Sequence, residues 1–304
     1  MNLKINIKNG AGMTKKTVGI VGLGRMGNGM AQSLLRKGFN VVGTDIGEAP
    51  RQAAREIGVN VVVDINALCA EAGVIILSLP MAKHVQAVVK GEGGIIDHAQ
   101  PNTLIIDTST SEPEVTRALS IELGQLGHQL LDCPVSGGPA GAAAGTMVMV
   151  VGGKRSSLER AQLYLDALSS DVVYMGKSGN GHAAKLINNL LCAAHLVSTA
   201  EAVALGTKAG LDPADLIAGL NAGSGRSAVS EVNFPRWILN KGFDSGFTMQ
   251  LMRKDVRLAQ NMISEMGLEL PLAEQVAEIW SQSEESIPDQ ADFNCIVKHA
   301  GLGE

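Results

Sequence analysis

Short apolar runs alternate with segments of helical periodicity through the first half of the chain. The helical pattern follows a glycine-rich turn as far as Lys37, covers residues 49–57, resumes from Asp64, and extends from Glu112 to about Leu126. Strands of continuous apolar sequence are typical of parallel sheets covered by helices on both faces. The pattern therefore predicts a mostly parallel, doubly wound α/β sheet. Its strands are expected at residues 17–21, 40–44, 61–63, 74–79, 104–106, 129–131, 147–151 and 172–174.

The pattern changes near Gly181, beyond which no strand is indicated. Residues 182–209 are rich in Ala and Leu and contain no proline, which predicts one helix of about 40 Å. Further helices are expected, with breaks at residues 212–213, 223–225, 242–246 and 271. We therefore expect a lead-in over residues 1–13, an α/β domain over 14–178, and an all-helical domain over 179–304 that begins with a long interdomain helix.

Composition argues against several classes of partner. The 304-residue chain has a net charge of −5 and no clusters of basic residues, so no electrostatic footprint for nucleic acid is expected. No apolar run approaches the roughly eighteen residues of a membrane span, so no membrane partner is expected. With 45% hydrophobic residues, the chain can bury a core large enough for more than one domain.

The cysteines and histidines predict neither disulfides nor a metal site. The six histidines form no HxxH or HxxxH pair, so no metal is expected. The cysteines have no paired spacing, which is typical of reduced thiols and predicts a cytoplasmic location. They are Cys69, Cys133, Cys192 and Cys295.

A glycine-rich turn carries the first functional motif, Gly22-Leu23-Gly24-Arg25-Met26-Gly27. A GxGxxG pattern is weak by itself, but this one follows a predicted strand and opens a predicted helix. An acidic residue, Asp45, follows about twenty positions on, as the dinucleotide-binding fingerprint of a Rossmann-type fold requires. Phosphates would bind at the free N–H groups of the helix start.

Asp45 also bears on the choice of cofactor. At the end of the second predicted strand, its carboxylate would accept hydrogen bonds from the adenine-ribose hydroxyls, which favours NAD. NADP would instead require a cation beside its 2′-phosphate. Arg51 is nearby in sequence but lies some residues into the following helix, so NAD is predicted and NADP is less favoured.

The run from Gly179 to Asn189 contains a candidate acid/base, Lys185. Residues three and four apart share a helix face, so Asn188 and Asn189 lie near the same face as Lys185. A desolvated lysine can titrate close to neutrality and transfer a proton. Most helix lysines are solvated instead, so the role of Lys185 depends on the other motifs of the chain.

Between about Val18 and Lys298 the sequence strongly resembles the β-hydroxyacid dehydrogenase family, which includes 3-hydroxyisobutyrate dehydrogenase and 2-hydroxy-3-oxopropionate (tartronate semialdehyde) reductase. The family usually has Ala at the position of Cys133. The motifs that carry the resemblance are Gly22–Gly27 with Asp45, residues 107–110 (Asp-Thr-Ser-Thr), residues 132–139 (Asp-Cys-Pro-Val-Ser-Gly-Gly-Pro), Lys185 with Asn189, and Lys254-Asp255.

The resemblance implies a role for each motif. Lys185 would be the catalytic acid/base, and Asn189 a substrate anchor one turn on. Thr110 would lie at the nicotinamide end of the cofactor, and Lys254 would close over nicotinamide and substrate. The substrate carboxylate would be held by Ser136, Gly137 and Gly138. A hydroxyl and successive backbone N–H groups can form an anion-binding concavity there.

The implied activity is NAD-dependent interconversion of a small β-hydroxyacid and its semialdehyde, as in 3-hydroxyisobutyrate dehydrogenase, in a homodimer or homotetramer assembled through the helical half. Tartronate semialdehyde reductase is the alternative substrate assignment. 6-Phosphogluconate dehydrogenase would need a longer helical half, and imine reductases typically lack the lysine. A non-catalytic nucleotide-binding module is the alternative from another class. His182 is the histidine nearest the candidate site, and Ser224, Arg226 and Ser227 remain unassigned.

Overall fold

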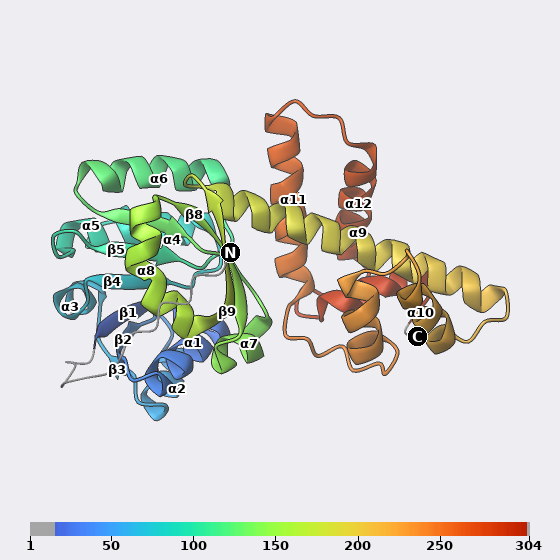
Figure 1. The fold of residues 1–304 in the computed structure, drawn as a ribbon, viewed down its shortest axis with the longest axis horizontal. Coiled ribbons are helices and arrows are strands. Elements are labelled where there is room, and N and C mark those ends of the chain that lie inside the picture. Colours follow the sequence, from blue (N-terminus) through green and yellow to red (C-terminus); the bar gives the residue numbers. More distant parts are fainter. Residues whose placement is uncertain (1–15, 303–304) are drawn as a thin grey trace.

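The computed structural model describes residues 16–302, so the expected lead-in over residues 1–13 lies outside the described residues. Figure 1 shows an α/β part and a helical part, joined by the long helix α9 (Asn180–Lys208), which crosses from one to the other. The predicted fold class, a Rossmann-type doubly wound sheet followed by helices, is confirmed.

The sheet has the order β3-β2-β1-β4-β5-β6-β8-β7, and β9 pairs with β8. Pairing is parallel from β3 to β6, whereas β8 runs antiparallel to β6 and β7. The sheet is therefore mostly parallel, as predicted. The strands are β1 (Thr17–Val21), β2 (Asn40–Thr44), β3 (Asn60–Val61), β4 (Val74–Leu77), β5 (Leu104–Asp107), β6 (Gln129–Asp132), β7 (Val135–Ser136), β8 (Met147–Gly153) and β9 (Ser169–Gly176).

Helices cover both faces of this sheet (Figure 1). The sequence pattern indicated α1, α2, α3 and α6, but it gave no boundaries for α4, α5, α7 and α8. The helices are α1 (Arg25–Arg36), α2 (Glu48–Glu56), α3 (Ile65–Glu71), α4 (Ala82–Lys90), α5 (Ile95–His98), α6 (Pro113–Gln125), α7 (Gly138–Ala144) and α8 (Arg155–Leu168).

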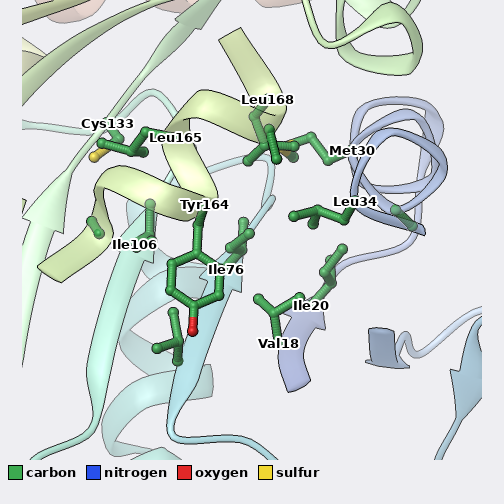
Figure 2. Packing of buried hydrophobic residues seen from close by; sticks show 14 of the residues in the cluster. Val18, Ile20, Met30, Leu34, Ile76, Ile106, Cys133, Tyr164, Leu165 and Leu168 are labelled. Carbon is green, nitrogen blue, oxygen red and sulfur yellow. The ribbon is translucent and has the colours of Figure 1, made fainter. Parts of the chain in front are cut away.

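Two apolar clusters fill the space between the sheet and its helices. Figure 2 shows the first, in which Met30 and Leu34 of α1 and Leu165 of α8 pack on buried side chains of the central strands. The second lies on the opposite face, where α3, α4 and α6 contribute side chains such as Leu68 and Leu119. Each fully buried aliphatic side chain contributes about 1.5–3 kcal/mol. Because both faces are covered, the central strands β4 and β5 are apolar at nearly every position and fully buried.

The helical part is built around α9, which begins two residues before the expected start. Its core contains Phe234 and Trp280, both almost fully buried. Within the described residues of this part, the only β-type pairing is the isolated bridge between Thr248 and Asp292. The other helices are α10 (Pro213–Ala222), a π-helix over Val229–Ile238, α11 (Met249–Glu265), α12 (Pro271–Gln282), and 3₁₀ turns over Ser283–Glu285 and Phe293–Ala300.

By length and composition, α9 could cross a membrane, contrary to the expectation that no run in the chain approaches a span. The core helix of a soluble protein passes the same test, so this property is weak support for a membrane role. Here α9 packs against α11, α12 and the turn over Phe293–Ala300. These contacts bury 33% of its most apolar stretch, so its place in the core accounts for part of its apolar composition.

The start of α9 is fixed by a carboxylate from the sheet. Asp132, at the end of β6 and fully buried, accepts hydrogen bonds from the backbone N–H groups of Gly179 (2.9 Å) and His182 (3.1 Å). These are donors that a helix start otherwise leaves unpaired. The N-cap residue is Gly179, which has no side chain to make such a bond. The sheet therefore sets the position of the first turn of α9 and, with it, of Lys185.

Candidate active site

The glycine-rich turn lies between β1 and α1 and is shaped to admit a pyrophosphate. A Cβ added to Gly27 would lie 1.9 Å from the carbonyl oxygen of Gly22. Only glycine at position 27 therefore allows the backbone of this turn to pack so closely. At Gly24 an added Cβ would meet nothing within 4 Å, which leaves that side of the turn open. No side chain caps the start of α1, so its first N–H groups are available to phosphate oxygens.

Asp45 follows β2 and is held beside this turn. Its two carboxylate oxygens accept hydrogen bonds of 2.7 Å from the backbone N–H groups of Leu23 and Gly47. The nearby cation, Arg51, is paired instead with Glu48, at 3.2 Å between Nε and Oε2. The turn and Asp45 thus form one unit whose donors and acceptors fit the ribose and phosphates of a dinucleotide.

Arg25, also in the turn, faces the helical part across a cavity of about 230 Å³. The opposite wall is a loop between the π-helix and α11, and Gly246 of this loop lies close to the Arg25 guanidinium. The sequence did not indicate that this loop faces Arg25. The loop lies more than 200 residues from Arg25 along the chain, and no local motif connects the two. The cavity lining is Arg25, Phe243, Asp244, Gly246, Phe247, Thr248, Gln290 and Asp292.

Lys185 and Ser136 come together where the two parts of the molecule meet. The Lys185 ammonium donates a 2.9 Å hydrogen bond to the Ser136 hydroxyl, which comes from β7. Burial lowers the pKa of Lys185 below its ordinary value, and the neighbouring Lys254 cation acts in the same direction. The Asp255 carboxylate and Cys192 oppose this shift of the pKa. Lys185 therefore loses its proton more readily than an ordinary lysine.

Gly137 and Gly138 follow Ser136 directly and begin α7. Gly137 has a φ of +124°, a backbone conformation that residues other than glycine rarely adopt. The Ser136 hydroxyl and the following backbone N–H groups can together accommodate an anionic group next to the Lys185 amine. The structure thus brings the predicted carboxylate-binding residues to the predicted acid/base.

A second set of polar side chains links α9 to α11. The Asn189 amide donates a 2.6 Å hydrogen bond to Asp255, and Asp255 lies 3.1 Å from the Lys254 ammonium. Lys254 also donates to the backbone carbonyls of Pro80 (3.2 Å) and Thr110 (3.1 Å). Lys254 therefore lies at Thr110, the residue predicted at the nicotinamide end of the cofactor.

Asn188 is exposed next to Asn189. Its side-chain amide donates to Asn189 Oδ1 at 3.1 Å. Asn189 is thus held on both sides, by Asn188 and by Asp255. The amide spacing in the sequence located the pair, but it did not indicate that one asparagine orients the other.

Three unassigned residues do not join this site within one chain. Arg226 pairs with Glu231 at 3.7 Å, and Ser227 hydrogen-bonds with Ser230. They follow α10, which packs on α9 near Gly206. Gly206 is 21 residues beyond Lys185, or about 30 Å along the helix. The remaining residue, Ser224, is exposed in the same connection.

The four cysteines are unpaired, as their spacing predicted, and Cys69, Cys133 and Cys295 are buried. Within residues 16–302, no group of three or more His, Cys, Asp or Glu side chains could hold a metal ion. A dinucleotide fold, a lysine beside a glycine turn that can accommodate an anion, and a contact between Lys254 and the Thr110 carbonyl after β5 are together typical of a nicotinamide-dependent dehydrogenase.

Comparison with known proteins identifies the family. Residues 17–176 match the NAD-binding domain of 6-phosphogluconate dehydrogenase, and residues 179–300 match a domain described as NAD-binding, of NADP-dependent 3-hydroxyisobutyrate dehydrogenase. The mitochondrial 3-hydroxyisobutyrate dehydrogenase of Mus musculus is 32% identical over 292 residues, covering 94% of this chain and 87% of that protein.

Two further relatives agree. The 2-(hydroxymethyl)glutarate dehydrogenase of Eubacterium barkeri is 33% identical, covering 92% of this chain and 93% of that protein. The solved structure of Mycobacterium tuberculosis 3-hydroxyisobutyrate dehydrogenase with L-serine has a TM-score of 0.86 at 31% identity, covering 94% of this chain and 99% of that one. The chain belongs to the β-hydroxyacid dehydrogenase family and is an NAD-dependent oxidoreductase that acts on the hydroxyl group of a β-hydroxyacid.

Proposed function

We propose that the protein interconverts 3-hydroxyisobutyrate, or a close analogue, and the corresponding semialdehyde, with Lys185 as general acid/base. The observation that carries this proposal is the 2.9 Å contact of the Lys185 amine with Ser136, at a position where burial lowers the pKa of Lys185. In this proposal residues 14–178 bind the cofactor, and residues 179–304 supply Lys185 and complete the substrate site.

Substrate binding follows from the polar groups around Lys185. Ser136, Gly137 and Gly138 hold the carboxylate, and the Asn189 amide, oriented by Asp255, holds the substrate one helical turn from Lys185. The glycine-rich turn over residues 22–27 binds the pyrophosphate, and Asp45 binds the adenine ribose. Thr110 and Lys254 border the nicotinamide.

The proton follows a short path. In oxidation, the neutral Lys185 amine accepts the hydroxyl proton while the bound nicotinamide cofactor supplies the hydride acceptor. In reduction, the Lys185 ammonium returns a proton to the aldehyde oxygen. The Ser136 hydroxyl keeps the amine pointed at the reacting oxygen. A well-placed acid/base contributes about two to four orders of magnitude in rate.

A substrate panel tests the proposal: 3-hydroxyisobutyrate, glycerate, threonate and 3-hydroxypropionate, together with tartronate semialdehyde in the reducing direction, followed by NAD(P)H absorbance. The name of the Eubacterium barkeri relative supports adding 2-(hydroxymethyl)glutarate. We expect the highest kcat/KM with 3-hydroxyisobutyrate. The highest value with tartronate semialdehyde would instead assign the reductase activity, and no turnover with any of these acids would contradict the proposal.

We expect the pH dependence of kcat/KM to follow the ionisation of Lys185. Burial lowers its pKa from the ordinary value of 10.5. Only the neutral amine accepts a proton, so kcat/KM for oxidation should fall as the pH decreases through this pKa. The reduction requires the ammonium and should fall as the pH rises through the same pKa. Measuring kcat/KM against pH for oxidation and for reduction tests this expectation. If the fall of kcat/KM for oxidation at lower pH persists in Lys185→Ala, another group is responsible for the ionisation.

We expect a homo-oligomer, a dimer or tetramer, assembled through the helical half. Along α9, Ile187 is 56% exposed, Leu191 55% and Leu205 73%. Ile187 and Leu205 are 18 residues apart, about five turns, and therefore share a face with Leu191 close by. Exposed apolar faces of this kind are typical of interfaces. Light scattering should give at least a dimer mass, and Leu191→Glu should lower it. A wild-type monomer mass at all concentrations would contradict this expectation.

The unpaired cysteines support a cytoplasmic location as part of the same proposal. Several relatives, including the Mus musculus protein, carry the word mitochondrial in their names. Cell fractionation with an antibody against the full chain would distinguish the two compartments. A small carboxylate is the proposed partner in either location.

A further inference from the structure

His182 is a fully buried histidine in the first turn of α9, three residues before Lys185. Its ring lies between β5, the segment that follows it, and α6. Sequence reasoning singled out His182 by its nearness to the candidate site, and the function described above leaves it without a role. Its contacts connect the helix that carries Lys185 to the segment that carries Thr110.

Both ring nitrogens of His182 have partners. Nε2 lies 3.0 Å from the backbone carbonyl of Ser109. A carbonyl only accepts, so Nε2 carries a proton and donates it. Nδ1 lies 2.7 Å from the Thr116 hydroxyl, which is also 3.2 Å from the carbonyl of Glu112. The ring is therefore held in one orientation with Nε2–H directed at Ser109.

The segment that His182 contacts is anchored at successive residues. Ser109 accepts a 3.0 Å hydrogen bond from the backbone of Leu79 through its hydroxyl and donates its own N–H to Asp107. Its carbonyl receives Nε2–H of His182 from α9, and the next carbonyl, that of Thr110, receives the ammonium of Lys254 from α11. The position of Thr110 is thus set by one bond from each of two helices of the helical part.

We propose that His182 is a positioning residue for hydride transfer. Its Nε2–H bond to the Ser109 carbonyl holds the nicotinamide-side segment at a fixed distance from Lys185. The proposal rests on the assigned roles of Lys185 and Thr110. Since α9 also carries the acid/base, one hydrogen bond couples proton transfer to the placement of the cofactor ring. A misplacement of about 1 Å in such a site lowers rates by about 100-fold, so loss of this bond should affect kcat.

A pair of substitutions separates the two ring contacts. In His182→Gln the side-chain amide can reach the position of Nε2 and donate to Ser109. In His182→Asn the shorter amide can reach only the position of Nδ1, beside Thr116. We expect His182→Gln to keep kcat within about threefold of the wild type, and His182→Asn to lower kcat about tenfold or more, with KM for NAD unchanged in both. Thr116→Val, which removes the Nδ1 partner at similar volume, is the matched control and should retain kcat.

The primary isotope effect distinguishes positioning from a general loss of folded protein. With substrate deuterated at the carbinol carbon, His182→Asn should show a larger isotope effect on kcat than the wild type, because slower hydride transfer limits turnover more strongly. Fewer folded molecules would lower the apparent kcat and leave the isotope effect unchanged. Thermal unfolding of all three variants gives the folded fraction.

The outcomes separate this inference from the proposed function. Equal losses in the Gln and Asn variants, or a loss in His182→Asn that follows the folded fraction with an unchanged isotope effect, would overturn the role of His182. Lys185→Ala is measured in parallel. If it loses activity while His182→Asn does not, only the positioning role fails. If Lys185→Ala retains activity, the proposed function and the role of His182 fail together.

Discussion

We expect Lys185→Ala to lower kcat by about two to four orders of magnitude while leaving NADH binding nearly unchanged. The hydrogen bond of the Lys185 amine is to Ser136 of β7, outside the glycine-rich turn, so the substitution should leave phosphate binding at that turn intact. The hydroxyl proton, however, loses its acceptor, and the alkoxide that would form without a base is poorly stabilised near neutral pH. Steady-state kinetics with 3-hydroxyisobutyrate and NADH fluorescence titration measure the two effects.

Two further variants make this test specific. Lys185→Arg keeps a positive charge, but guanidinium does not become neutral in proteins, so oxidation should remain as slow as in the alanine variant. Lys208→Ala removes an exposed lysine at the far end of the same helix and should retain wild-type kcat. Near-wild-type turnover of Lys185→Ala would reduce Lys185 to a structural residue.

The second large effect concerns Asp45. We expect the wild type to prefer NAD over NADP by one or two orders of magnitude in kcat/KM, and Asp45→Asn to reduce that ratio. A 2′-phosphate beside Asp45 would place like charges in contact. At an effective dielectric constant of about 20, one such contact at 4 Å costs about 4 kcal/mol before screening. The ion pair between Arg51 and Glu48 keeps the Arg51 cation engaged elsewhere.

Asp45→Asn also disturbs the glycine-rich turn, since both carboxylate oxygens accept backbone N–H groups. The informative quantity is therefore the ratio of kcat/KM for the two cofactors rather than either value alone. Glu48→Gln is a second probe, because it releases Arg51 and should improve NADP use. Asp64→Asn, at the exposed start of α3, is the matched control. A wild-type preference for NADP, or a ratio unaffected by Asp45→Asn, would show that Asp45 does not discriminate between the cofactors.

Local sequence predicted the strands and the long helix well, and the errors have physical causes. The expected strand over residues 74–79 ends at Leu77. The Ser78 N–H makes the last bond to the neighbouring strand, to Val21 of β1, and the Leu79 N–H bonds to the Ser109 hydroxyl instead. The two-residue strand β7 was missed, because two residues are too few to show a strand periodicity.

The site was partly predictable for the same reason. The glycine-rich turn with Asp45 is a local motif that its spacing and its place between a strand and a helix make recognisable. Lys185 and Asn189 share a helix face by spacing, and the resemblance to the family supplied their roles. The contacts of Lys254 with Thr110 and of His182 with Ser109 join residues 144 and 73 positions apart. Spacing along the chain gives no information about such pairs.

By itself, therefore, the sequence determined the elements of this protein and the chemical groups available to it, because hydrophobic periodicity, glycine spacing and helix-face spacing are properties of neighbouring residues. The tertiary structure alone decided where those groups meet. Asp132 at the end of β6 fixes the first turn of α9, and the partly buried Lys185 amine then meets Ser136. The lowered pKa of Lys185 arises from that burial, which depends on the packing of two parts of the chain and not on the residues beside Lys185 in sequence.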